Sequence, residues 1–96
     1  SVFINLHINI SLLLIENCYF SEALNILINV EDLCRNKRLY FQLSIILIRK
    51  GICLNNLDQQ QSNGSVLIDK GKKYLIMFSE IETLNILEKE IDLYNP

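Results

Sequence analysis

Apolar residues recur at intervals of three and four along almost the whole chain, and this spacing predicts helices. The stretch 38–57 is apolar on two faces, with Gln42 and Arg49 on a narrow polar edge between them. A helix this apolar has neighbours on more than one side, so we expect it in the middle of an array of antiparallel helix hairpins. The predicted fold class is all-α, with about five helices over residues 1–17, 21–36, 38–56, 63–78 and 80–94.

The first helix is ambiguous, because residues 2–11 also alternate between apolar and polar side chains, which is the pattern of a strand. The run continues apolar through Leu12–Ile15 without a turn residue, and this favours one helix with two apolar faces. Ser21 is expected to cap the second helix, and Ser79 with Glu82 has the spacing of a capping box before the fifth. The two faces of the first helix are Phe3, Leu6, Ile10, Leu13 and Leu14, and Ile4, Ile8, Leu12 and Ile15.

Two helix pairs repeat along the chain. The first and third helices superpose at a shift of 40 residues, which aligns Ser11 with Gly51, and the second and fourth superpose at 41, which aligns Ala23 with Gly64. Small residues at these places would let the two helices of a hairpin approach closely. Since glycine inside a helix costs about 1 kcal/mol relative to alanine, we expect Gly51 and Gly71 at helix contacts. The alternative is that they occupy solvent-facing sites.

Each unit therefore has a small residue in its first helix and another small residue early in its second helix. This pattern resembles the tetratricopeptide repeat, although the period near 40 is longer than the usual 34 residues. The resemblance implies a tetratricopeptide-like array, in which the first helix of each pair lines a concave surface. The matching residues are Ser11, Ala23, Leu27 and Val30, then Gly51, Gly64, Ile68 and Gly71.

Four segments carry a closer resemblance: YFSEALNIL at Tyr19–Leu27, IRKG at Ile48–Gly51, KGKKYL at Lys70–Leu75 and ILEKEI at Ile86–Ile91. In their residue types and in their order along the chain, these segments resemble the C-terminal helical domain of the Rgg/GadR/MutR family of bacterial transcription regulators. The resemblance implies a domain that dimerises and binds a short signalling peptide. It also implies that DNA is bound by an N-terminal helix-turn-helix domain outside residues 1–96, and a chain beginning at Ser1 instead of Met fits an excised domain.

Composition narrows the class of protein. Ninety-six residues suffice for one domain with one core, and a net charge of −2 leaves no basic stripe for nucleic acid. The opening run Val2–Ile15 is shorter than the roughly 18–20 apolar residues of a membrane span, so no membrane contact is expected. Cys18, Cys34 and Cys53 are odd in number and form no CxxC pair, which indicates free, buried thiols in a reducing cytoplasm.

Residues that could support catalysis or bind a metal are scarce. His7 is the only histidine, and the chain has no HExxH, GxSxG or phosphate-binding glycine loop. We therefore expect no enzymatic activity, no cofactor and no metal site, with His7 partly buried or facing a groove. Glu88, Glu90 and Asp92 on the last helix are expected to face solvent.

Two surfaces are predicted to bind partners. The concave surface would be an apolar trough with amide groups at its ends, which suits a short hydrophobic peptide. The alternative is that its isoleucines are core under another helix. A minor stripe on the last helix, Ile86 and Leu93, predicts a homodimer contact, with two ordinary exposed aliphatic residues as the alternative. The trough would be lined by Asn5, Ile8, Leu12, Ile15, Ile48, Ile52 and Asn55.

The leading functional hypothesis is a regulatory sensor domain, which binds a short apolar signalling peptide and mediates dimerisation. The alternative is a helical-repeat scaffold that docks a segment of a partner protein and has no small ligand. A helix-turn-helix encoded upstream of Ser1 would favour the first hypothesis.

Overall fold

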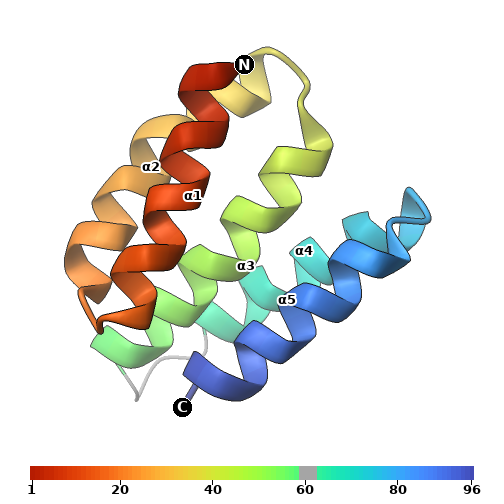
Figure 1. Cartoon of the computed structure of the whole chain (residues 1–96). Coiled ribbons are helices and arrows are strands. Elements are labelled where there is room, and N and C mark those ends of the chain that lie inside the picture. The colour runs from red at the N-terminus through yellow and green to blue at the C-terminus, as the bar shows by residue number, and fades with distance from the viewer. Residues whose placement is uncertain (59–62) are drawn as a thin grey trace.

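The chain folds into helices that are joined by short links and alternate in direction (Figure 1). The structure is a computed structural model that describes residues 1–58 and 63–96. Over those residues it has five helices and no strand, so the all-α prediction is confirmed and the strand alternative for residues 2–11 is wrong. No predicted end differs by more than two residues from the observed one. The helices are α1 (Val2–Glu16), α2 (Phe20–Asn36), α3 (Tyr40–Leu57), α4 (Asn63–Met77) and α5 (Ile81–Tyr94).

The links α1–α2, α2–α3 and α4–α5 share one conformation. Each has three residues, and the middle one lies in the left-handed region of backbone space. After α4, the amide of Glu80 donates to the carbonyl of Leu75 over 2.8 Å, and the amide of Ser79 donates to the carbonyl of Ile76 over 3.1 Å. This is a Schellman turn, which pairs carbonyl groups that the last helical turn leaves free. The left-handed residues are Cys18 (φ 63°), Arg38 (φ 57°) and Ser79 (φ 58°).

Both predicted N-caps are wrong because of these turns. The N-cap residue of α2 is Tyr19 and that of α5 is Glu80, and neither helix has a side-chain cap bond. Ser21 therefore lies inside α2, and Ser79 belongs to the turn that ends α4. The turn that ends α1 likewise leaves Cys18 exposed, which corrects the prediction that all three thiols are buried.

Replacing Ser79 with glycine is expected to raise the free energy of unfolding by about 0.5–1 kcal/mol. A residue with a Cβ costs roughly 1–2 kcal/mol in the left-handed region, and the larger backbone entropy of glycine in the unfolded chain offsets part of that gain. Urea denaturation measures the change. As a control, Lys89→Gly at an exposed site within α5 should lower stability by about 0.7 kcal/mol. A loss at Ser79 as well would argue against strain in the turn.

Helices α3 and α4 form the most extensive contact in the molecule, and they meet at buried glycines. A Cβ on Gly51 would press against the carbonyl oxygen of Gly64 and lie 2.7 Å from Cγ1 of Ile68. Gly71 is equally enclosed by α3. The glycines therefore lie at helix contacts as predicted, and the solvent-facing alternative is wrong. Ser11, which the repeat aligns with Gly51, is buried in the same way on α1.

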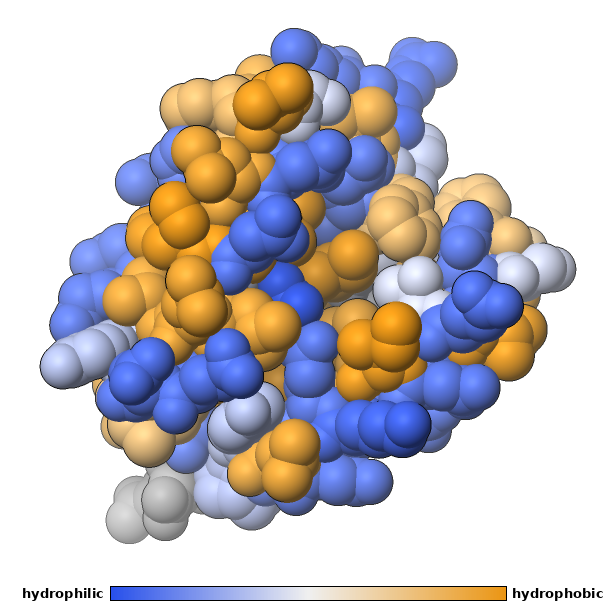
Figure 2. Space-filling model, viewed as in Figure 1, coloured by the Kyte–Doolittle hydropathy of each residue, from blue (hydrophilic) through white to orange (hydrophobic). Residues whose placement is uncertain are grey.

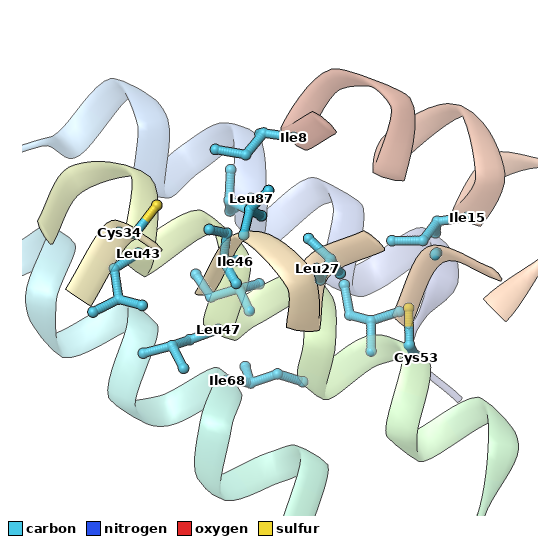
Figure 3. Close-up of a cluster of buried hydrophobic side chains, with 14 of the residues drawn as sticks. Ile8, Ile15, Leu27, Cys34, Leu43, Ile46, Leu47, Cys53, Ile68 and Leu87 are labelled. Atoms are coloured by element: carbon cyan, nitrogen blue, oxygen red, sulfur yellow. The ribbon is translucent and has the colours of Figure 1, made fainter. Parts of the chain in front are cut away.

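All five helices contribute side chains to one hydrophobic core (Figure 3). The largest share comes from α3, which confirms the prediction that this helix is central and covered on more than one face. Burial raises the pKa of the Cys53 thiol to about 12, although the charge of Arg49 acts in the opposite direction. The core residues of α3 are Leu43, Ile46, Leu47, Ile48, Ile52 and Cys53.

Candidate functional site

Most of the residues predicted to line a peptide trough are instead buried in the protein. Asn5 is exposed and Leu12 is half-buried. For the isoleucines, the alternative interpretation of core under another helix is correct, because all four are buried where α2 and α3 pack on α1 and where α2 and α4 pack on α3. The described residues therefore hold no open trough of the predicted composition. The five buried members are Ile8, Ile15, Ile48, Ile52 and Asn55.

The error lies in the choice between the two apolar faces of α1. Ser11 shares a stripe with Ile4, Ile8 and Ile15, and all four are buried. A small residue marks the side on which a neighbouring helix approaches, and the repeat had already aligned Ser11 with Gly51. The sequence thus contained a signal that this stripe is core. On the other face of α1, Phe3, Leu6 and Leu13 stay exposed.

The amide of Asn55 is already bonded within the protein. Its Nδ2 donates to Oδ1 of Asn95 over 2.9 Å, just beyond the end of α5. Beside it, Nδ2 of Asn56 lies 2.8 Å from the carbonyl oxygen of Tyr94 and 2.9 Å from that of Ile52. These bonds fasten the last turn of α5 to the last turn of α3. They correct the prediction that Asn55 offers its amide to a ligand.

Arg49 connects three helices at the centre of the array. Its Nε and Nη2 donate to the two carboxylate oxygens of Glu90 on α5, over 2.9 and 3.1 Å, and its Nη1 donates to the carbonyl of Ile8 on α1 over 2.8 Å. Arg49 and Glu90 are each only 7% exposed. The prediction that Glu90 faces solvent is therefore wrong. A buried carboxylate needs a paired charge, and Arg49 supplies it in a bidentate geometry.

The spacing of these bonds is close to the period of the sequence repeat. Ile8 and Arg49 are 41 residues apart, and so are Arg49 and Glu90. The three helices joined by Arg49 therefore follow one another at about one repeat, since the first and third helices superpose at a shift of 40, and α3 contacts both α1 and α5. The sequence analysis did not include the last helix in the repeat, because it superposed only the first four helices.

Exposed aliphatic side chains flank the ion pair on α5. Ile86 lies one turn before Glu90 and Leu93 one turn after it, so both share the side of α5 that faces Arg49. Their exposed fractions are 56% and 72%. The two residues predicted as a dimer contact are therefore available at the surface, next to the junction of α3 and α5.

On α1, Asn5 and Leu12 lie one turn on either side of Ile8, whose carbonyl bonds to Arg49. We call these two residues, together with Ile86 and Leu93 on α5, the inner surface, because each lies one turn from a residue that Arg49 bonds. Figure 2 shows hydrophobic side chains along α1 and others over α5, with hydrophilic side chains between them. The inner surface thus combines aliphatic groups with an exposed amide, and an internally neutralised ion pair lies between its two sides.

A second charged cluster joins α2 to a different side of α3. Glu31 accepts hydrogen bonds from Nζ of Lys50 at 2.7 Å and from Nη2 of Arg35 at 2.9 Å. Burial acts to raise the pKa of Glu31, but the bonds and charges of Lys50 and Arg35 outweigh it and hold this pKa below its ordinary value. The bond to Lys50 identifies the side of α3 that α2 covers.

Other candidate chemistry is limited. Nδ1 of His7 lies 2.7 Å from the carbonyl oxygen of Phe3, and the two rings are in contact with centroids 4.2 Å apart. Among residues 1–58 and 63–96, no group of three or more histidine, cysteine or acidic side chains could hold a metal ion. In the same part of the chain, no helix has both the length and the apolar character needed to cross a bilayer.

Comparison of the chain with protein-family models, with curated proteins and with solved structures gives no match. The resemblance to the Rgg/GadR/MutR family therefore stays a prediction from the sequence. The features that bear on function are the inner surface and the buried ion pair beside it.

Proposed function

We propose that the chain is the regulatory sensor domain of a transcription regulator and binds a short apolar peptide at the inner surface. The supporting observation is the position of Ile86 and Leu93, which are exposed beside the buried Arg49–Glu90 pair. The DNA-binding domain would precede Ser1. The proposal places the protein in the cytoplasm, in keeping with its three free cysteines.

The chemistry of the inner surface suits an uncharged, apolar ligand. Ile86 and Leu93 would bury aliphatic side chains of the peptide, with Leu12 on the opposite side of the surface. The amide of Asn5 offers both a donor and an acceptor to a peptide backbone. Arg49 and Glu90 neutralise each other, so they give no advantage to a charged peptide. The isoleucines of the core support this surface from below and do not contact the ligand.

Titration with short, blocked peptides of leucine and isoleucine tests the proposal. Ile86→Asp is expected to weaken binding at least tenfold, because it places a charge where the peptide is desolvated, and to leave the urea midpoint unchanged. The matched control is Ile76→Asp on α4, since Ile76 is 57% exposed and Ile86 is 56% exposed. Absence of binding, or an equal effect of both variants, would remove the inner surface as a peptide site.

The same residues carry the predicted homodimer contact. Burying Ile86 and Leu93 would contribute about 1.5–3 kcal/mol for each side chain. One surface cannot hold a peptide and a second copy at once, so the proposal implies that peptide and dimer compete at this place. Sedimentation of wild type and of Ile86→Glu/Leu93→Glu, with and without peptide, distinguishes the two uses, and a wild-type monomer at high micromolar concentration argues against the dimer.

A scaffold that docks a segment of a partner protein is the alternative function. It would use the same inner surface and would need no DNA-binding domain. The coding sequence upstream of Ser1 separates the two functions, because a helix-turn-helix there favours the sensor.

A further inference from the structure

The outward face of α1 is an uncovered apolar stripe. Phe3, Leu6 and Leu13 are 56%, 53% and 61% exposed. With Ile10 they follow one another along α1 at intervals of three, four and three residues. This is the spacing by which one helix packs along another. No side chain from Val2 to Ile15 has a permanent charge, and Figure 2 shows hydrophobic residues following α1. Such a continuous apolar stripe on a surface helix marks an interaction site.

The corresponding stripe on α3 is covered by a helix. At the repeat shift of 40, the stripe on α1 aligns with Leu43, Ile46, Lys50 and Cys53. The three apolar members are 1%, 0% and 0% exposed. Lys50 bonds to Glu31 on α2, and α2 packs along this side of α3. The same face is therefore core in the second unit and bare in the first.

We infer that the bare face of α1 is covered by one amphipathic helix of the same polypeptide, which precedes Ser1 and lies on α1 as α2 lies on α3. Three of the helix links have three residues and one conformation. A helix joined to α1 by such a link would be delivered to the bare face at high effective concentration. A second copy of the chain would have to find the face by a bimolecular encounter.

The repeat alignment also indicates the chemistry expected of the covering helix. α2 presents Glu31 to Lys50, but the aligned residue on α1 is Ile10. The covering helix therefore carries an apolar residue where α2 has Glu31, and its stripe is uncharged along the length of α1. This inference needs no peptide at the inner surface, so it stands or fails independently of the proposed function.

The test compares the 96-residue chain with a longer chain that also contains the natural residues before Ser1. This extension has the combined length of α2 and one link. In the extended chain, Leu6→Asp is expected to lower the urea midpoint strongly, because it would bury a charge under the new helix. In the 96-residue chain the same change should leave the midpoint nearly unchanged. Leu6→Ala should show the same difference on a smaller scale, in case the aspartate variant does not fold. Ile76→Asp is the control and should change the urea midpoint by the same amount in both chains.

Three results would overturn the inference. The natural residues before Ser1 could lack an apolar helical stripe. The effect of Leu6→Asp on the midpoint could be the same in both chains. The 96-residue chain could sediment as a dimer that Leu6→Asp dissociates, which would make a second copy the occupant of this face.

Discussion

Replacing Glu90 with leucine is expected to lower the free energy of unfolding by about 3–5 kcal/mol, because it leaves the Arg49 guanidinium buried without its counter-charge. Arg49→Met should cost about as much, since it strands the Glu90 carboxylate. The double variant Arg49→Met/Glu90→Leu is expected to recover most of this loss. Apolar groups of similar volume remove both charges together, and replacing a buried pair in this way is often neutral.

Urea denaturation of the two single variants and the double variant gives the coupling energy directly. Glu88→Leu is the matched control, because Glu88 is an exposed carboxylate on the same helix and its loss should change stability by no more than about 0.5 kcal/mol. A cost at Glu90 no larger than at Glu88 would contradict the view that the pair fixes α5. A double variant as unstable as Arg49→Met would instead assign the effect to the bond between Arg49 and the carbonyl of Ile8.

Gly51→Ala is expected to destabilise the protein by about 1–3 kcal/mol through overpacking. The added methyl group would meet the backbone of Gly64 and the side chain of Ile68, and a backbone group cannot rotate aside. Helix propensity acts in the opposite direction, because alanine is favoured over glycine by about 1 kcal/mol within a helix. The sign of the measured change therefore shows which effect is larger.

Asp69→Ala provides the comparison for Gly51→Ala. It introduces alanine at an exposed site of α4, where no neighbour crowds the new residue, and should be neutral or slightly stabilising. A stabilised Gly51→Ala variant would mean that α3 and α4 can separate by a fraction of an ångström at little cost.

The fold could be predicted from the sequence because helix spacing and small residues act locally. The bounds of all five helices follow from residues a few positions apart, and the contact role of Gly51 and Gly71 follows from the repeat and from the cost of glycine within a helix. The N-caps could not be predicted in the same way. Ser21 and Ser79 have good capping chemistry, but the preceding helices end in Schellman turns that use Cys18 and Ser79 in left-handed conformations.

The candidate site was only partly predictable, because it depends on which apolar faces are covered. Ile86 and Leu93 were recognised as a separate stripe, and Asn5 and Leu12 stay at the surface or close to it. Periodicity alone does not distinguish a face that packs on a neighbour from one that faces solvent. The buried state of Glu90 depends on Arg49, 41 residues away, and no local pattern in α5 indicates that partner.

Helix α5 is packed less extensively against α3 and α4 than those two are against each other. Its deep contacts are Leu87, the ion pair of Glu90 and the bonds at Tyr94 and Asn95. Regions with few buried contacts open locally at a lower free energy than the whole molecule unfolds. The backbone amides of α5 should thus exchange with deuterated water while α3 keeps its protons. A molecule lodged between α1 and α5 would therefore slow the exchange of amides in this last helix.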